Sequence, residues 1–282
     1  MCLNAEGCIK PTFSERRYGI RFYSPLFIGD DFLNLKEQLI LSFLSLKKQF
    51  ILNFVDDSRW KYLANGLWNT VQIAFFAVLL GILIGIVIAT VRSTYDKNRD
   101  ELARKKSFGY YLLCVLNAIC KIYLTIIRGT PVVVQLMIAY FIIFALSNNG
   151  IMVASFAFGI NSGAYVAEIL RGGIMSIDEG QFEAGRSLGF NYIQTMIYII
   201  IPQVFKSVLP ALLNEFIALL KETSVAGYVG IKDLTKGGDI IRGRTFSAFL
   251  PLIAVAVIYL IIVMLLTFAV GRLERRLRKN ER

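Results

Sequence analysis

Three stretches without a charged residue constrain the fold of this chain more than any other feature. They cover residues 62–91, 129–167 and 245–271, which are 30, 39 and 27 residues long. The hydrocarbon core of a bilayer requires about 20 apolar residues of helix. Each stretch is therefore long enough to cross a membrane, and the sequence predicts an all-α integral membrane protein.

The remaining composition excludes several other classes of protein. The net charge is +11, but the basic residues gather in 92–106 and 272–282, where apolar segments end, so we expect no nucleic-acid partner. The chain has no histidine, no CxxC pair among its four cysteines and no GxxxxGK loop. We therefore expect no catalytic residue, no metal site and no cofactor in this chain.

The apolar pattern predicts about five transmembrane helices. They are expected at about 64–91, from near 108 to 146, 151–170, 194–220 and 247–270. The second contains Pro131, which should kink it, and Lys121 and Arg128, which lie on one face and can reach toward water. Gly81 and Gly85 form a small-xxx-small pair, which indicates either packing within the chain or contact with a second copy.

The ends of the chain differ from the middle. Residues 1–60 read as an N-terminal extension, in which 29–54 carry an apolar stripe interrupted by lysines, as in an interfacial amphipathic helix. Residues 276–282 form a basic tail. An odd number of spans places the two ends on opposite sides, and the dense basic clusters favour a cytoplasmic C-terminus.

The segment GQFEAGRSLGF, residues 180–190, interrupts two apolar spans with polar residues and glycine. Ser176 and Glu179 have the spacing of a capping box, Glu183 and Arg186 have the i,i+3 spacing of an ion pair, and Gly189 can close a helix. Phe182 and Leu188 mark an apolar side, and Asn191 with Gln194 can cap the next span. These signals predict a short amphipathic helix on the cytoplasmic side, and a solvated loop remains the alternative.

The sequence EAGRSLGFNYIQTMIYIIIP resembles the EAA motif of importer-type ABC transporter permeases. Glu183, Ala184, Gly189, Ile199 and Pro202 stand at the matching positions, whereas Gly185 replaces the second alanine and Ile201 replaces a leucine. A glycine within a helix costs about 1 kcal/mol relative to alanine, which suggests a looser helix here. The segments IRGTPVVVQL (127–136), NSGAYVAEILRGGIMSIDEGQ (161–181) and LLKETSVAG (219–227) resemble the polar amino-acid uptake branch of that family.

The resemblance implies a function and a set of partners. Residues 61–275 would be an ABC importer transmembrane domain, and the chain a multi-pass permease of a bacterial cell membrane that imports a polar or charged amino acid. A dimeric ATPase subunit would supply ATP and Mg²⁺, an extracellular substrate-binding protein would deliver the substrate, and a second permease copy or a sibling would complete the pore. The ATPase would grip a coupling helix through Glu183, Ala184, Gly185, Arg186 and Gly189. A secondary transporter driven by an ion gradient is the alternative.

Polar residues within the spans are candidates for the substrate path, because buried polar groups in a membrane usually serve a function. The candidates are Asn161, Ser162, Tyr165, Glu168, Asn214, Glu215, Thr223 and Ser224. For Glu168, an i,i+3 ion pair with Arg171 is the favoured alternative. Thr223 and Ser224 form either a gate or a plain helix end.

Overall fold

A computed structural model describes residues 44–105 and 108–279, and every regular element in these two ranges is helical. Residues 47–282 form the unit considered below. Most of the predicted interfacial helix lies outside the described residues, and its described part, residues 44–54, is helical. Five helical segments are long and apolar enough to span a membrane: Trp60–Lys97, Phe108–Gly129, Gly150–Met175, Tyr192–Val229 and Phe249–Leu277. The predicted all-α fold with five spans is confirmed.

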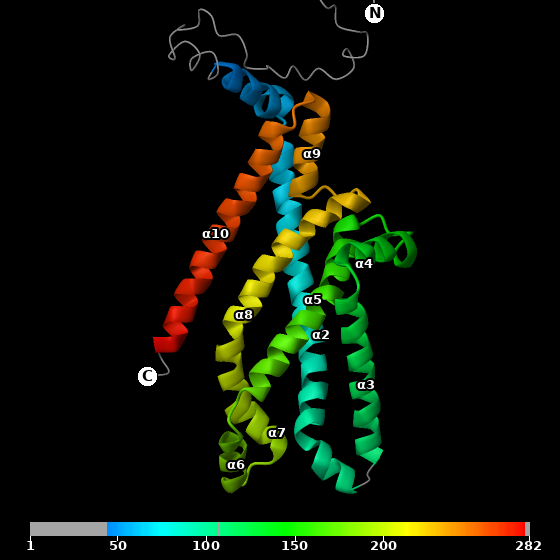
Figure 1. The fold of residues 1–282 in the computed structure, drawn as a ribbon, viewed down its shortest axis with the longest axis vertical. Helices are drawn as coiled ribbons and strands as arrows, with labels where there is room; N and C mark the ends of the chain where they lie inside the picture. Colours follow the sequence, from blue (N-terminus) through cyan, green and yellow to red (C-terminus); the bar gives the residue numbers. More distant parts are fainter. Residues whose placement is uncertain (1–43, 106–107, 280–282) are drawn as a thin grey trace, which may run out of the picture. The chain divides into compact units, whose positions relative to one another are not determined.

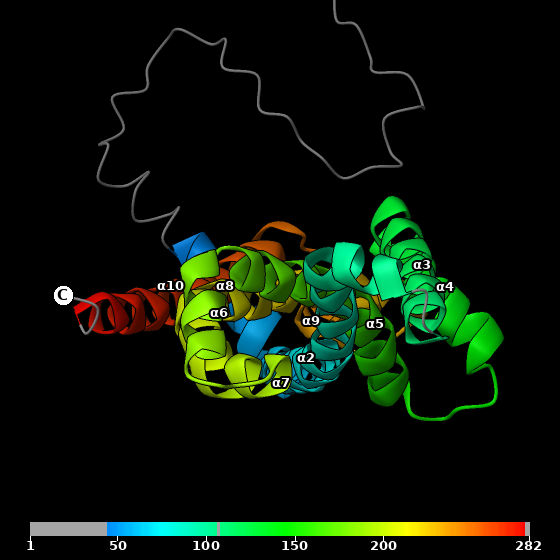
Figure 2. The same cartoon turned by 90° about the horizontal axis from the view of Figure 1, so that it is seen from below.

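The helices follow one another along the chain with short connections (Figure 1). In order they are η1 Ile51–Val55, η2 Asp56–Ser58, α2 Trp60–Lys105, α3 Phe108–Gly129, α4 Val132–Ile138, η3 Ala139–Ile143, α5 Gly150–Met175, α6 Glu179–Ser187, α7 Tyr192–Thr195, η4 Met196–Ile200, α8 Ile201–Glu222, η5 Thr223–Val229, α9 Leu234–Thr245 and α10 Phe249–Lys279. Seen from the end that carries α6 and α7, α3 and α4 lie on one side of α2, and α10 lies on the other (Figure 2).

The core of the unit is the seam between α2 and α5, where glycines let two helices approach closely. A Cβ added at Gly81 would lie 3.0 Å from Ser162 Oγ, and one at Gly85 would lie 2.5 Å from Val166 Cγ1. Gly159 and Gly163 of α5 meet side chains of α2 in the same way. The small-xxx-small pair therefore packs within this chain, which decides between the two readings of that motif.

The helix is interrupted at Pro131, whereas the sequence predicts a kink within one continuous helix. Pro131 has extended backbone (φ −64°, ψ 135°) and precedes α4, because proline has no N–H to continue the helical hydrogen bonds. The Gln135 side chain occupies the break, where its Nε2 donates to the carbonyl oxygen of Ile127 at 2.7 Å and to Thr130 Oγ1 at 2.8 Å. The second span is thus α3 alone, and 132–143 form a separate shorter helix.

The two ends of the unit carry different connections (Figure 1). The helices α6 and α7 join α5 to α8 at the end toward which α2 descends. Helix α9 packs against the start of α2 at the opposite end, where a Cβ at Gly237 would lie 2.5 Å from the Tyr62 carbonyl oxygen. The Gly-rich segment between the last two spans is therefore largely helical.

Candidate functional site

The short helix α6 begins at a different cap from the one predicted. Asp178 is its N-cap, and Asp178 Oδ1 accepts the N–H of Gly180 at 2.7 Å. The predicted capping box from Ser176 to Glu179 is wrong, because the Ser176 hydroxyl donates to the Gly173 carbonyl oxygen at 2.8 Å and so belongs to the end of α5. The carboxylate suits this position, since the first N–H groups of a helix lack partners within it.

The end of α6 agrees with the sequence prediction. Gly189 has a φ of 82°, in the left-handed region that favours glycine, and the Phe190 N–H donates back to the Gly185 carbonyl oxygen at 3.0 Å. The next helix starts with a capping box, in which Asn191 and Gln194 each accept the other's backbone N–H at 2.9 Å. Both turns around α6 are thus closed by local hydrogen bonds.

One side of α6 is packed against α7 and the adjoining helices. Phe182 is 6% exposed and its ring stacks on Tyr192 with centroids 6.4 Å apart. Gly185 is buried, and a Cβ there would lie 2.6 Å from Thr195 Oγ1. Gly185 therefore faces inward, where its lack of a side chain lets α6 lie close to Thr195, and the expectation that it loosens the helix has no support in this packing.

The other side of α6 is open. Glu183, Ala184, Arg186 and Gly189 are exposed, and Leu188, predicted to face inward, is 71% exposed. Leu188 follows the last turn of α6, so its side chain points away from the packed side. The predicted ion pair between Glu183 and Arg186 is absent from the described part of the chain, where neither side chain has a partner. This surface displays two separate charges and an apolar side chain beside small residues.

The end of α2 beside α6 contacts the same segment, and the sequence pattern did not predict this contact. Asp96 Oδ2 lies 3.0 Å from Arg171 Nη1 near the end of α5, and Lys97 Nζ lies 3.9 Å from the centroid of the Phe182 ring. Cations are attracted to the face of an aromatic ring. The signal in the sequence for these contacts is the run of charges after residue 91, which is also typical of a membrane boundary.

Two of the substrate-path candidates lie in the middle of α5 and join it to neighbouring helices. Asn161 Nδ2 donates to Gln135 Oε1 at 3.0 Å, and Ser162 Oγ donates to Glu215 Oε1 of α8 at 3.0 Å. Asn161 and Ser162 are buried. The structure therefore brings Asn161, Ser162 and Glu215 into one polar layer between α4, α5 and α8.

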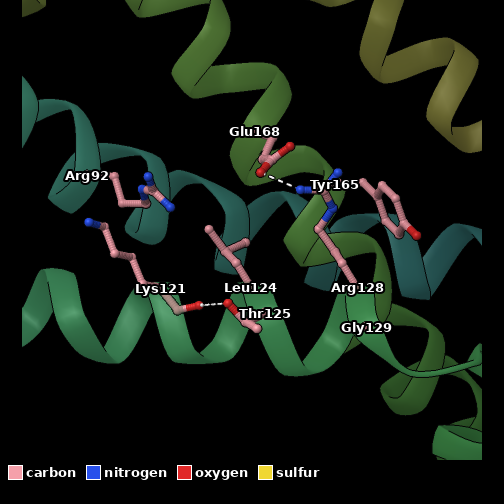
Figure 3. A pocket seen from close by; sticks show the side chains of 8 residues that line it. All are labelled: Arg92, Lys121, Leu124, Thr125, Arg128, Gly129, Tyr165 and Glu168. Atoms are coloured by element: carbon pink, nitrogen blue, oxygen red, sulfur yellow. Dashed lines mark hydrogen bonds and ion pairs between the residues drawn. The ribbon is translucent and has the colours of Figure 1, made fainter.

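Glu168 pairs with Arg128, and not with Arg171 as the favoured alternative had it (Figure 3). Glu168 Oε1 lies 2.5 Å from Arg128 Nη1, and the Arg128 guanidinium carbon lies 5.6 Å from the centroid of the Tyr165 ring. Arg171 is taken up by Asp96. Arg128 reaches Glu168 because α3 ends beside α5, a proximity that spacing along the chain does not reveal.

The remaining candidates lie apart from this polar layer. Asn214 is exposed on α8. Thr223 is buried, and its hydroxyl donates to the Leu220 carbonyl oxygen at 2.8 Å, as at an ordinary helix end. Ser224 lines a separate pocket of about 420 Å³ beside α9.

Helix α9 borders that pocket. Two aspartates, one at its N-cap and one within it, have pKa values that are shifted in opposite directions. Asp233 caps α9 by accepting the N–H groups of Thr235 and Lys236. Burial raises the pKa of the Asp233 carboxyl above its usual value of 3.8, although these hydrogen bonds oppose the shift. Hydrogen bonds from Lys236 and Arg242 lower the pKa of Asp239.

Comparison with known proteins agrees with this geometry. The arginine transport system permease protein ArtQ of Bacillus subtilis is 33% identical over 223 residues, which cover 78% of this chain and 94% of that protein. The glutamine transport system permease protein GlnP of Escherichia coli is 39% identical over 178 residues, which cover 61% and 80%. The crystal structure of an amino acid ABC transporter with histidines matches with a TM-score of 0.67 and 36% identity, and covers 79% of this chain and 98% of the matched chain.

The family described as binding-protein-dependent transport system inner membrane component matches residues 108–279. This range includes α3, the break at Pro131, the polar layer of α4, α5 and α8, and the whole of α6 and α10. The chain therefore belongs to the family of binding-protein-dependent transport system inner membrane components.

Proposed function

We propose that this chain is the membrane-spanning permease subunit of an importer for a polar or charged amino acid, driven by ATP that a separate subunit hydrolyses. Its family and its five apolar helices make it a multi-pass protein of the bacterial inner membrane and a component of transport. The names of its relatives, which refer to arginine and glutamine, support the substrate class.

The open side of α6 is the observation on which the proposal depends. Glu183 and Arg186 are exposed without a partner among the described residues. Ala184 and Gly189 have small side chains or none, so the backbone of a partner protein can approach α6 closely. A helix closed by local hydrogen bonds at both turns can seat in a groove of an ATPase subunit with little loss of entropy. We propose that Glu183 and Arg186 pair with charges in that groove, and that Leu188 adds apolar contact.

The packed side of α6 provides the route by which ATP would act. Phe182 and Gly185 hold α6 to α7, which continues into η4 and α8, and only Ser176 and Ile177 separate α5 from the N-cap Asp178. A displacement of α6 therefore moves α5 and α8 together. These two helices meet at the Ser162–Glu215 hydrogen bond, so closure of a dimeric ATPase around ATP and Mg²⁺ would act directly on the polar layer.

The polar layer and the residues beside it form the proposed substrate path. Asn161, Ser162 and Glu215 offer donors and acceptors within the membrane, and Tyr165 and Glu168 extend the polar surface along α5. An amino acid carries both an ammonium and a carboxylate group, which need partners of both kinds. An extracellular binding protein would deliver it, and a second permease copy or a sibling would form the other half of the pore.

The proposal can be tested by reconstitution with a candidate ATPase subunit and binding protein in liposomes. Uptake should require ATP inside and should be absent with a proton or sodium gradient alone. Glu183→Lys should abolish binding of the ATPase while membrane insertion is retained. Gly189→Asp should do the same, because a side chain at a φ of 82° strains the turn after α6.

The matched control is Arg276→Glu, a charge reversal at another exposed position on the predicted cytoplasmic side. It should leave ATPase binding and uptake unchanged. Uptake driven by an ion gradient without ATP would refute the proposal in favour of a secondary transporter. Normal ATPase binding by both coupling-helix variants would refute the assigned role of α6.

A further inference from the structure

A hollow of about 610 Å³ lies between α2, α3 and α5, and it shares Tyr165 and Glu168 with the proposed substrate path but none of the three residues of the polar layer (Figure 3). It is lined by Arg92, Lys121, Leu124, Thr125, Arg128, Gly129, Tyr165 and Glu168. Three of these side chains are cationic and one is anionic. The hollow therefore carries an excess of two positive charges.

The excess charge belongs to Arg92 and Lys121. Glu168 neutralises Arg128, whereas the side chains of Arg92 and Lys121 have no hydrogen-bond or ion-pair partner within the described ranges. Both point into the same part of the hollow from facing helices (Figure 3). Arg92 Nε is also buried without a hydrogen-bond partner. A buried N–H without a partner and two like charges side by side both destabilise the fold, so the arrangement calls for an anion.

The position of the hollow indicates where that anion comes from. Arg92 directly follows the charge-free residues 62–91, so it marks the end of the apolar part of α2. One turn further along, Asp96 already contacts Arg171 near the start of the coupling segment. In the predicted orientation the Arg92 end of the hollow thus lies toward the cytoplasmic side of the membrane, where anionic lipid head groups are found, and the Gly129 end lies deeper in the span.

The outer surface of α3 beside the hollow is apolar. Ile119, Ile122 and Ile126 are 57%, 60% and 55% exposed and follow one another at helical spacing. Ile122 and Ile126 are the immediate neighbours of Lys121 and Thr125, which line the hollow. A ligand with a charged head and an aliphatic tail would satisfy both surfaces at once, whereas a free anion would leave the isoleucines uncovered.

We infer that this hollow binds the phosphate head group of an anionic membrane lipid. Arg92 and Lys121 donate to the phosphate oxygens, and the acyl chains lie along the isoleucines of α3. The Arg128–Glu168 pair closes the far side of the site, and it limits the net attraction to the two free cations.

The inference is tested with the purified, delipidated full chain and two lipids of equal chain length, phosphatidylglycerol and phosphatidylcholine. Native mass spectrometry should show preferential binding of phosphatidylglycerol. Since a cation near an anionic head group contributes about 1 kcal/mol, the double variant R92Q/K121Q should bind phosphatidylglycerol about thirtyfold more weakly, with phosphatidylcholine binding unchanged. The control K206Q/R272Q removes two cations from α8 and α10 and should behave as the wild type does. Equal binding of phosphatidylglycerol by R92Q/K121Q and wild type would overturn the inference.

Competition and melting experiments separate the lipid from other anions. Inorganic phosphate at millimolar concentration should not displace the lipid, and saturating arginine or glutamine should not displace it either. Displacement by phosphate would identify a general anion site, and displacement by an amino acid would place the hollow on the substrate path; each would overturn the inference.

In nanodiscs of phosphatidylcholine, R92Q/K121Q should melt at or above the wild-type temperature, and phosphatidylglycerol should raise only the wild-type melting temperature. A variant that melts well below the wild type in phosphatidylcholine would show that the two cations already have partners, and would also overturn it.

Discussion

The contact between Gly185 and Thr195 allows a quantitative test of how the coupling helix is held. A Cβ at position 185 would lie 2.6 Å from Oγ1 and 2.7 Å from Cγ2 of Thr195, well inside the separation of about 3.5–4.0 Å at which carbon atoms rest. The substitution Gly185→Ala would restore the alanine of the EAA motif and favour the helix by about 1 kcal/mol. In this chain we nevertheless expect it to destabilise α6.

The expected magnitude follows from two opposing effects. Overpacking a close contact costs about 1–3 kcal/mol, and the gain in helix propensity offsets about 1 kcal/mol of that. The net loss in the free energy of opening the segment should therefore be about 1 kcal/mol. Thr195→Ala removes both clashing atoms, and it breaks no hydrogen bond, because Thr195 Oγ1 is buried without a partner. The double variant keeps the gain in helix propensity without the clash, so it should be at least as stable as the wild type, with a coupling energy of about 1–3 kcal/mol between the two positions.

Hydrogen–deuterium exchange of residues 182–190 in the intact chain measures the opening directly. Gly185→Ala should speed exchange about fivefold, Gly185→Ala with Thr195→Ala should restore it, and Ala184→Ser at the exposed neighbouring position should change nothing. If Gly185→Ala exchanges as the wild type does and the cycle shows no coupling, α6 is not seated on Thr195 and the argument for its rigidity fails.

Three further predictions test other contacts. Glu168→Gln should lower the free energy of unfolding by at most about 1 kcal/mol, because both partners of the Glu168–Arg128 pair are about two-fifths exposed. In a double-mutant cycle of thermal melts, Arg128→Gln should cause little further loss of stability in the Glu168→Gln background. Additive losses would show that the two residues act separately. Asp96→Asn breaks the pair with Arg171, so substrate should stimulate the ATPase less while ATPase binding is retained; an unchanged stimulation ratio would exclude a role for this pair in coupling. Burial raises the pKa of Asp233, so the folded state favours its protonated form and stability should fall as pH rises from below 4 through the raised pKa. Asp233→Asn should remove that part of the slope in melts between pH 4 and 8, and a slope that persists would contradict it.

The features that the sequence predicted correctly are those that depend on neighbouring residues. The number of spans follows from the apolar segments along the chain, since crossing a bilayer is a matter of local composition. The turn at Gly189 and the cap formed by Asn191 and Gln194 follow from side chains that bond their own backbone. These elements need no knowledge of the rest of the fold.

The features that were missed depend on which helices lie side by side. Arg171 and Arg128 were both available to Glu168, and only the approach of α3 to α5 selects Arg128, 40 residues away along the chain. The inward orientation of Gly185 depends in the same way on Thr195 in the next helix. The spacing of charges along α6 predicted an ion pair between Glu183 and Arg186, but an i,i+3 pair on an exposed surface contributes only a few tenths of a kcal/mol. Such a pair is too weak to hold two long side chains together.

The unbroken length of α2 has a mechanical consequence. From Trp60 to Lys97 it extends for about 57 Å, touches α9 at one end and Phe182 at the other, and is clasped by α5 at Gly81 and Gly85 between them. A stiff rod held near its middle is a lever, with the glycine seam as its pivot. Motion imposed at the coupling end should therefore reappear, reversed in direction, at α9 on the opposite side of the membrane. The chain would then pass a motion of α6 to α9 through one helix, without a relay of side chains.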